Sequence, residues 1–335
     1  MGRSAPARRV LVHEYVTGGG LAGSDLPASW AAEGSAMRRA LAEDLAVVPG
    51  IHVVMTLDDR LPDEPGPWAT VRVGPGQEPE TFARLAVEVD YTIAIAPETG
   101  GTLLDGARIL ERLGARSLGC EARAIALAGD KLRMARCWQR HRIPTPPTRW
   151  VRPAWPLPEG IDFGDGDGVP RVIDPYPVVV KPVDGAGSVQ TYLIRSSGDC
   201  WPDGALGMAS ALLQPYLPGV PMSASFLVDA RGRATLVGVG RQRVEVRDGR
   251  FHYRGGLVPA GPQLPVPVEE LWRAIAPVGG LRGWVGLDFL WDEATGRAVM
   301  LEINPRPTTS YVGLRRLLPP GELARVWLAA IEGPD

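Results

Sequence analysis

Three features of the chain predict an α/β fold at the N-terminus followed by an α+β region. First, short apolar runs alternate with helical patterns over roughly the first 120 residues, which is typical of a parallel sheet covered on both faces. Second, two later blocks are rich in strand-forming residues. Third, the length of 335 residues exceeds the size at which one hydrophobic core stops growing, so two or three packed subdomains are expected.

The first strand is expected at Val10–Val12, an apolar run closed by polar residues and by the glycines Gly18–Gly20. A helix is expected to begin near Ala28. Two more apolar runs predict strands, and two stretches with helical spacing predict helices. These strands are Val53–Met55 and Tyr91–Ala96, and these helices are Phe82–Val89 and Leu103–Leu113.

The three glycines after the first strand invite a dinucleotide-binding interpretation, but they lack the G-x-G-x-x-G spacing that places a pyrophosphate on a helix N-terminus. A flexible turn is therefore the favoured interpretation, and a nicotinamide-dependent oxidoreductase would lack its phosphate fingerprint. Ligands of open α/β sheets collect at the carboxyl ends of the strands. Glu14 and Gly19 are therefore candidate substrate contacts.

Between residues 150 and 177 the composition shifts to Pro, Gly and Asp without a period, which predicts an inserted loop. Two strand-rich blocks follow, and then a helix and two final strands are expected. The blocks are Val178–Ile194 and Leu212–Val246, the helix is Glu269–Val278, and the strands are Val285–Trp291 and Ala298–Ile303.

Charge and cysteine content exclude several classes of protein. The formal net charge of -2 provides no basic field for DNA or RNA. The cysteines Cys120, Cys137 and Cys200 are odd in number and widely spaced, which favours reduced thiols over disulfides or a zinc site. No apolar run has the length of a signal peptide or a membrane span. The sequence thus predicts a cytoplasmic protein without nucleic-acid or membrane partners, and it leaves open whether the chain forms a homo-oligomer.

A lysine and a small-residue loop follow directly from the apolar run Val178–Val180. Lys181 ends this predicted strand, and the loop after it is free to expose backbone N–H groups that approach phosphate oxygens closely. Taken alone, the block is equally well explained as a solvated lysine beside a common turn. The loop consists of Asp184, Gly185, Ala186, Gly187 and Ser188.

Two acidic residues, Asp288 and Glu302, each follow an apolar run that is typical of a buried core. Strand alternation places Glu302 and Asn304 on one face, and Asp288 lies opposite them if the strands pair as a hairpin through Glu293–Gly296. Two carboxylates and an amide match the oxygen ligands that Mg²⁺ prefers. The alternative, a polar strand face satisfied by its neighbours, gives the two carboxylates no reason to lie in core-like sequence.

These blocks in this order, with Gly129–Lys131 upstream, resemble the ATP-grasp superfamily. The resemblance implies ATP and Mg²⁺ as cofactors, with Mn²⁺ as the alternative ion. It also implies a Rossmann-like pre-ATP-grasp domain followed by a two-lobed ATP-grasp domain. The expected boundaries are 1–120 for the first domain, 121–335 for the second, about 145–213 for its lid lobe and about 214–330 for its metal-binding lobe.

Nucleotide-binding roles follow from the same resemblance. Lys131 matches the lysine that reaches the α-phosphate, and Lys181 matches the lysine that reaches the α- and β-phosphates. The loop 184–188 matches the lid loop that closes over the phosphates. The adenine is held by a hinge whose matching residues are Gln214, Tyr216 and Leu217.

The resemblance also implies the residues of phosphoryl transfer. The implied magnesium ligands are Asp288, Glu302 and Asn304. Arg306 looks like the arginine that steadies the transferred phosphate, and together with Lys181 it is a candidate catalytic residue. Many members place a glutamate for the ribose after the hinge glycine, but here Gly219 is followed by valine and proline, so Ser223 or Ser225 is left for that contact.

Within the superfamily the chain resembles the tyramine-glutamate ligases of methanofuran synthesis and their relatives in methylotrophic bacteria. The matching segments are 11–20, 95–103, 129–131, 240–242 and 255–256. This resemblance implies L-glutamate as the carboxylate substrate and tyramine or tyrosine as the amine. The implied substrate contacts are Glu14, Gly19, Glu98 and Gln242. Glu14 or Glu98 would pair with the substrate ammonium, whereas the alternative makes both of them solvated loop acids.

The resemblance thus implies an enzyme that joins a carboxylate to an amine through an acyl-phosphate, with ATP converted to ADP. Another ATP-grasp amino-acid ligase that makes a peptide or amide is an alternative. A non-catalytic ATP-binding sensor is a further alternative, but such a protein is expected to lose a metal ligand, and this chain retains all three.

Overall fold

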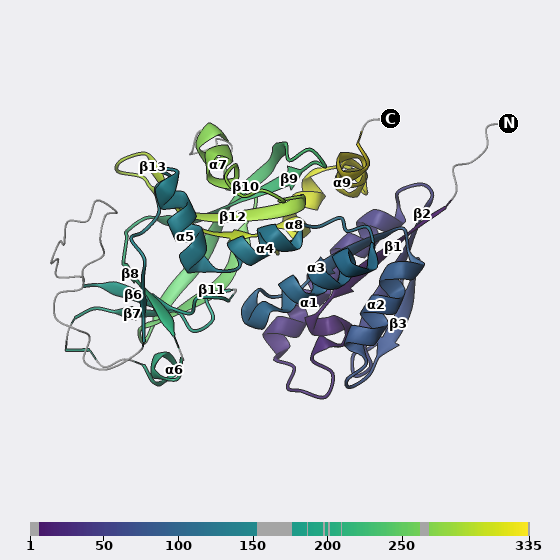
Figure 1. Cartoon of the computed structure of the whole chain (residues 1–335), viewed down its shortest axis with the longest axis horizontal. Helices are drawn as coiled ribbons and strands as arrows, with labels where there is room; N and C mark the ends of the chain where they lie inside the picture. The colour runs from purple at the N-terminus through teal and green to yellow at the C-terminus, as the bar shows by residue number, and fades with distance from the viewer. Residues whose placement is uncertain are drawn as a thin grey trace.

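The computed structural model describes residues 7–152, 176–185, 187–196, 198–199, 202–208, 210–261 and 268–333. Within these residues the chain forms an N-terminal half on a parallel sheet and a C-terminal half on a largely antiparallel one, side by side in Figure 1. Most of the loop expected at 150–177 lies outside the described residues. No helix in the described ranges is long and apolar enough to cross a membrane.

The N-terminal half contains a parallel four-stranded sheet in the order β3-β2-β1-β4. Its elements are β1 (Arg8–Glu14), η1 (Val16–Gly20), α1 (Ala28–Ala46), β2 (Ile51–Asp58), β3 (Trp68–Val73), α2 (Glu78–Glu88), β4 (Tyr91–Ile95), η2 (Thr99–Gly101) and α3 (Thr102–Leu113).

Alternation along the strands explains why both faces of this sheet are covered. Val10 and Val12 of β1 pack in the core beneath α1, whereas Leu11 packs with residues of α2 and α3 on the opposite face. All three side chains are fully buried. Burial on both faces is the reason that β1 reads as a continuous apolar run, and it confirms the parallel sheet that the sequence predicts.

The C-terminal half contains a nine-stranded sheet in the order β13-β12-β9-β10-β11-β7-β6-β8-β5. Its elements are α4 (Ala122–Ala128), α5 (Lys131–Arg140), β5 (Arg149–Val151), β6 (Val178–Lys181), β7 (Tyr192–Ile194), α6 (Asp203–Leu206), β8 (Ala211–Pro215), β9 (Val220–Val228), β10 (Ala234–Arg247), β11 (Arg250–Leu257), α7 (Val268–Ile275), β12 (Gly283–Asp292), β13 (Arg297–Asn304), α8 (Ser310–Leu314), η3 (Arg315–Leu317) and α9 (Glu322–Glu332).

This large sheet divides into two lobes. Strands β5, β6, β7 and β8 surround one small core, whereas β9, β10, β12 and β13 share a larger core with α4, α5 and α7. The lobes are joined through β11, whose register with β7 consists of the pair Arg250 and Tyr192. A connection this narrow fits two lobes that enclose a ligand between them.

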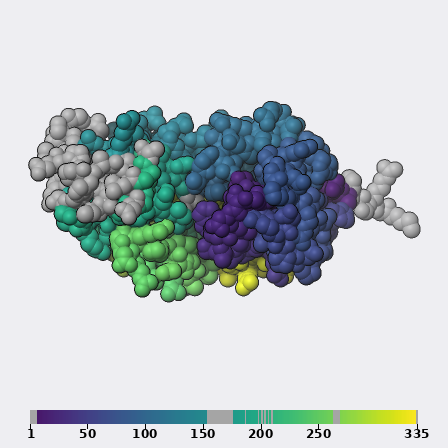
Figure 2. Space-filling view, turned by 90° about the horizontal axis from the view of Figure 1, so that it is seen from below, coloured from purple at the N-terminus to yellow at the C-terminus, as the bar shows by residue number. Residues whose placement is uncertain are grey.

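A cluster of aromatic side chains joins the N-terminal half to the C-terminal half. The ring of Trp284 lies 5.0 Å from that of Tyr311 and 6.1 Å from that of Trp327, in the same core as α1. The buried Tyr311 hydroxyl donates to Asp44 Oδ2 of α1 at 2.9 Å. The two halves are therefore packed as one body, and the space-filling view shows them meeting along a seam (Figure 2).

The predicted elements of the N-terminal half are confirmed, including the start of α1 at Ala28. The expected helix over 269–278 and the last two strands also agree with α7, β12 and β13 to within a few residues. Strand β3 was missed because it is an edge strand, mostly part-exposed or exposed, and so has no apolar run.

Candidate active site

Two carboxylates and an amide meet on the β12–β13 hairpin, as the sequence predicts. Asp288 lies opposite Glu302, and Asn304 lies opposite Gly286. Asn304 Nδ2 donates to Asp288 Oδ2 at 3.0 Å, and Gln242 Nε2 of β10 donates to Asp288 Oδ1 at 2.9 Å. Gln242, expected to contact substrate, is thus a direct partner of a proposed metal ligand.

The pKa values of the two carboxylates are shifted in opposite directions. Burial raises the pKa of Asp288 well above its ordinary value, and the adjacent Glu302 carboxylate raises it further. Burial also acts to raise the pKa of Glu302, but the ammonium groups of Lys131 and Lys181 outweigh burial and hold that pKa below its ordinary value. Close carboxylates of this kind are typical of a site that accepts a divalent cation.

The start of α5 aims Lys131 at this hairpin. The helix begins at Lys131 because Asp130 caps it, its carboxylate accepting from Arg133 N at 2.9 Å. Lys131 Nζ lies 2.9 Å from Glu302 Oε2 and donates to Gly185 O at 2.6 Å. Burial acts to lower the pKa of Lys131, but Glu302 outweighs it, so the pKa is raised and the ammonium stays charged.

Lys181 ends β6 on the other lobe, and its environment differs from that of Lys131. The residue is 8% exposed, and it has no hydrogen bond or ion pair among the residues that the structure describes. Burial lowers its pKa to about 8, against the opposing effect of Glu302. A buried ammonium without a partner is costly unless a ligand supplies the missing anion. The environment of Lys181 is thus compatible with the expected phosphate contact, which stays a prediction.

The pKa of Lys181 predicts how nucleotide affinity depends on pH. Below about pH 8 the ammonium is charged and attracts phosphate, and above that pH it loses its proton and the attraction. A bound phosphate would keep the proton in place, so the dissociation constant of a non-hydrolysable ATP analogue should rise roughly tenfold between pH 7 and pH 9. Calorimetry measures this change.

The pKa of Lys181 can be measured directly, because Lys131 and Lys181 are the only lysines of the chain. Reductive ¹³C-methylation would therefore label two side chains and the α-amine, and each NMR signal can be titrated separately. Lys181→Met should remove both the titrating signal and the pH dependence of binding. An unchanged pH dependence in this variant would contradict the assignment to Lys181.

The loop after Lys181 crosses to the N-terminal half. Asp184 Oδ2 accepts from Gly100 N at 2.7 Å, in the turn that follows β4. Gly185 and Gly187 have φ angles of 138° and 65°, a backbone conformation that glycine adopts without strain, and Ser188 has a φ angle of 61°. Ala186, between them, lies outside the described residues. The structure thus brings the glycine-rich loop 184–188 next to Gly100, although the two are far apart in sequence.

The predicted adenine residues follow β8. Gln214 is 5% exposed and donates through Nε2 to Thr148 Oγ1 at 2.7 Å. Tyr216 N donates to Pro177 O at 2.8 Å, while the Tyr216 side chain is 40% exposed. Leu217 follows in the connection between the lobes. Their contacts with adenine stay a prediction.

Arg306 of the C-terminal half and Glu98 of the N-terminal half form a bidentate ion pair. Arg306 Nε and Nη2 donate to the two oxygens of Glu98 at 2.9 Å and 3.0 Å. Both side chains are largely buried, and Glu98 outweighs burial to raise the pKa of Arg306. Glu98, expected to bind the substrate ammonium, thus holds the guanidinium that the family resemblance assigns to the transferred phosphate.

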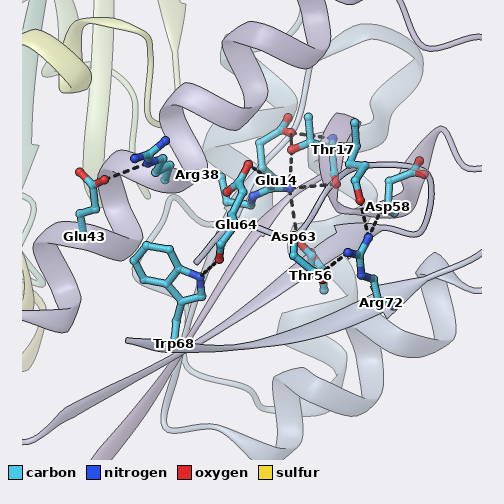
Figure 3. Close-up of polar contacts among 12 residues, drawn as sticks. Glu14, Thr17, Arg38, Glu43, Thr56, Asp58, Asp63, Glu64, Trp68 and Arg72 are labelled. Carbon is cyan, nitrogen blue, oxygen red and sulfur yellow. Dashed lines mark hydrogen bonds and ion pairs between the residues drawn. The ribbon is translucent and has the colours of Figure 1, made fainter. Parts of the chain in front are cut away.

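Glu14 is not solvated, because its carboxylate closes the turn after β1 (Figure 3). Its oxygens accept from Thr17 N at 2.8 Å, Thr17 Oγ1 at 2.6 Å and Val16 N at 3.1 Å. Thr17 also accepts from the fully buried guanidinium of Arg38 at 2.7 Å. These bonds account for an acid that is 2% exposed, and a substrate contact by Glu14 stays a prediction.

Gly19 lies in the same turn, with φ of 105°, and a Cβ there would come within 2.3 Å of Val73 Cγ1. This close approach to β3 explains the glycine without a ligand. Of the serines left for the ribose, Ser225 is buried, with its Oγ 2.8 Å from Ser310 Oγ. A role of Ser223 also stays a prediction.

Tyr253 of β11 was missed from the sequence. Its hydroxyl lies 3.3 Å from Thr309 Oγ1, in the segment that follows Arg306. Burial raises the pKa of Tyr253, and the carboxylates of Asp288 and Glu33 raise it further. Sequence alternation alone could not reveal this residue, since a bulge between the paired residues Gln242 and Val244 shifts the register of β10 against β11.

The residues present fit Mg²⁺ and a nucleotide. Within the described ranges, no group of three or more His, Cys, Asp or Glu side chains could hold a metal ion. The candidate is instead Asp288, Glu302 and the Asn304 amide, and this oxygen set suits Mg²⁺ when phosphate oxygens complete the coordination. Lys181 would supply positive charge for those phosphates.

Two family models match the chain in tandem. The model described as a pre ATP-grasp 3 domain matches residues 51–125, and the model described as an ATP-grasp domain matches residues 128–310. The second range contains every residue of the nucleotide and metal set described above. The domain limits themselves, expected near residue 120, stay a prediction.

Curated relatives and solved structures agree with these matches. Tyramine–L-glutamate ligase from Methanocaldococcus fervens is 25% identical over 229 residues, which is 68% of this chain and 62% of that ligase. D-alanine–D-alanine ligase from Acidiphilium cryptum is 27% identical over 59% of this chain and 64% of that ligase. A solved ATP-grasp superfamily protein from Archaeoglobus fulgidus has a TM-score of 0.68 at 22% identity, covering 97% of this chain and 89% of that one.

Proposed function

The chain belongs to the ATP-grasp family, and from this premise we propose that it is a ligase that converts ATP to ADP to join a carboxylate to an amine through an acyl-phosphate. One observation carries the proposal. Three cationic side chains of the C-terminal half, Lys131, Lys181 and Arg306, converge on a paired Asp288 and Glu302 from its two lobes. Such a site neutralises charge during phosphoryl transfer.

Each residue has a part in this reaction. Lys181 and Lys131 hold the phosphates of ATP, and Arg306, fixed by Glu98, steadies the phosphoryl group as it moves to the carboxylate. Asp288, Glu302 and Asn304 would hold Mg²⁺, which supplies positive charge beside the transferred phosphate. The loop 184–188 would limit the access of water to the acyl-phosphate, which water would otherwise hydrolyse.

For the substrates, we propose L-glutamate as the activated acid, tyramine or tyrosine as the amine, and a γ-glutamyl amide as the product. The likeness to the Methanocaldococcus ligase supports this choice. Mg²⁺ is the proposed ion rather than Mn²⁺, and ATP and Mg²⁺ are what the family uses. An enzyme supplied with these small molecules would work in the cytoplasm, and homo-oligomer formation stays a separate prediction.

A second candidate is a ligase that joins two amino acids into a dipeptide. The match to D-alanine–D-alanine ligases, with identity as high as that of the first relatives, favours it. The non-catalytic sensor is disfavoured because the two carboxylates, the amide and both lysines are all brought together.

Mass spectrometry of reaction mixtures tests the substrates. Purified protein with ATP and Mg²⁺ is offered glutamate or alanine as the acid, and tyramine, tyrosine or an aliphatic amine as the acceptor. We expect a γ-glutamyl amide of tyramine or tyrosine as the main product, because the likeness to tyramine–L-glutamate ligases implies an aromatic acceptor. If alanine were used efficiently in place of glutamate, the assignment as a ligase would stand, but glutamate as the activated acid would be rejected.

A further inference from the structure

A cavity lies in the C-terminal half between helix α7, the turn from β9 to β10 and the segment that leads from α7 into β12. Its volume is about 560 Å³, which is within the range of cavities that bind small molecules. Among the described residues that line it, none is assigned above to the nucleotide, the metal or the substrates. Figure 1 shows α7 well apart from β6, which ends at Lys181, so the cavity is separate from the proposed active site.

Strand β12 relates this cavity to the metal carboxylates. The strand begins at Gly283, directly after the lining residue Arg282, and Asp288 follows five residues later. At roughly 3.3 Å per residue, this length of strand separates Gly283 from Asp288 by about 16 Å. The same strand thus borders both places without joining them.

Arg282 brings an unpaired guanidinium to the wall of the cavity. Its Nε atom is buried without a hydrogen-bond partner, and the side chain makes no hydrogen bond or ion pair with any residue that the structure describes. Arg282 and Glu121 also line a smaller cavity of about 280 Å³, so the two cavities adjoin at these side chains. A buried cationic group without a partner is costly, and an anionic ligand would remove that cost.

The backbone holds Arg282 in place. Cys120 Sγ donates to Arg282 O at 3.2 Å and accepts from Arg282 N at 3.4 Å. The next residue, Gly283, has a φ of 64°, and a Cβ there would lie 1.9 Å from Leu118 O. The chain before β12 is therefore packed tightly against the segment 118–120. This packing positions the arginine before any ligand arrives, which lowers the entropic cost of binding.

The other charged residues of the lining leave the cavity positive. Arg123 pairs with Glu121 at 2.7 Å, and this glutamate is the single acid among the described lining residues. Arg231 is exposed in the β9–β10 turn, and the nearby Asp229 carboxylate binds a different arginine at 2.7 Å. Two arginines, Arg231 and Arg282, therefore line the cavity without an acid to neutralise them.

Apolar side chains form the rest of the lining. The Trp272 side chain of α7 is 43% exposed, although tryptophan is usually buried. Four aliphatic residues of the lining are buried, namely Val228, Ile275, Val278 and Leu281. An accessible aromatic ring beside aliphatic groups suits a planar or apolar ligand body.

From this cavity and its charges we propose a second ligand site, which binds a small molecule that carries a phosphate or carboxylate group on an aromatic or other apolar body. Arg282 and Arg231 hold the anion, and Trp272 packs against the body. Guanidinium groups bind both kinds of anion through paired N–H donors. The site goes beyond the proposed ligase reaction and does not depend on it.

Calorimetry with phenyl phosphate and with phenylacetate tests the site. Inorganic phosphate supplies the anion alone, and benzyl alcohol supplies the body alone. An excess of a non-hydrolysable ATP analogue with Mg²⁺ keeps the probes out of the nucleotide site. The variants are Arg282→Gln, Arg231→Gln and Trp272→Ala. Arg273→Gln is the matched control, because this arginine is exposed on the same helix α7 and does not line the cavity.

We expect at least one aromatic anion to bind the wild type more tightly than inorganic phosphate, and benzyl alcohol not to bind. Arg282→Gln should weaken this binding roughly tenfold, and Arg231→Gln roughly threefold, while Arg273→Gln stays within about twofold of the wild type. Trp272→Ala should weaken the aromatic anion more than inorganic phosphate. The relative affinities of phenyl phosphate and phenylacetate separate a phosphate ligand from a carboxylate ligand.

Fluorine NMR places the bound probe. With 5-fluorotryptophan at the ten tryptophans of the chain, the Trp272 signal is identified by its loss in Trp272→Ala. The anion should shift this signal in the wild type and in Arg273→Gln. Thermal unfolding checks the fold of Arg282→Gln, and Arg231→Gln changes only an exposed turn. No saturable binding of either anion to the wild type, or unchanged affinity in both Arg282→Gln and Arg231→Gln, would overturn the site.

Discussion

Replacement of Glu302 by Gln is expected to abolish ADP formation while the protein stays folded. The change removes one negative charge at nearly constant volume from a carboxylate that lies opposite Asp288 and 2.9 Å from Lys131 Nζ. Charge stabilisation by a bound metal contributes several kcal/mol to the transition state, so turnover should fall roughly a thousandfold or more. Asp288→Asn should behave in the same way.

Steady-state ADP release at saturating Mg²⁺ measures this loss. Glu293→Gln is the matched control, because it makes the same change in the turn of the same hairpin, where Glu293 is exposed and 3.6 Å from Arg241. The control should keep near-normal turnover. Normal ADP release by Glu302→Gln would remove this carboxylate from the metal site.

Replacement of Lys181 by Met is expected to weaken nucleotide binding by roughly 10- to 100-fold, without a matching loss of affinity for the carboxylate substrate. Methionine keeps most of the apolar stem and loses the ammonium. Because Lys181 is buried and has no hydrogen bond or ion pair with another described residue, its removal should not lower the free energy of unfolding. The loss of affinity can then be attributed to the phosphate contact.

Calorimetry with a non-hydrolysable ATP analogue measures the affinity, and thermal unfolding without nucleotide checks the fold. Lys181→Arg is the second variant, since it keeps the charge but replaces a compact ammonium with a planar group. It should bind more tightly than Lys181→Met. Unaltered affinity in Lys181→Met would contradict the role assigned to this lysine.

The lysine content of the chain supports the role of Lys131 and Lys181 in nucleotide binding. Lys131 and Lys181 are the only lysines among 36 Lys and Arg residues, and 34 are therefore arginine. Both lysines lie in the proposed nucleotide site, where their side chains are mostly buried. A compact, rotatable ammonium fits between phosphate oxygens where a guanidinium fork would require more space.

Local patterns predicted much of the fold and the metal set. Alternation and the turn at 293–296 were enough to place Asp288, Glu302 and Asn304 together, because a hairpin joins residues that are close in sequence. Continuous apolar runs predicted the buried parallel strands, because burial on both faces of the sheet leaves its mark within each strand's own sequence. The capping of α5 by Asp130 also lies in the sequence, but the position of Lys131 beside Glu302 depends on how two distant elements pack.

The roles of the acids in the N-terminal half could not be predicted from the sequence. Glu98 meets Arg306 across 208 positions of the chain, and no local pattern encodes such a contact. Glu14 turned inward because the turn after β1 exposes N–H groups that an acid can satisfy.

Transfer of labelled oxygen from the carboxylate substrate to phosphate tests most directly the claim that the reaction passes through an acyl-phosphate. Glutamate that carries ¹⁸O in its γ-carboxylate is incubated with the protein, ATP, Mg²⁺ and the acceptor amine, and the released phosphate is examined by mass spectrometry. An acyl-phosphate pathway predicts that each phosphate released with ADP carries one ¹⁸O atom from the carboxylate, because the bond to the acyl carbon breaks in the second step. Unlabelled phosphate, or release of AMP with pyrophosphate, would contradict the account.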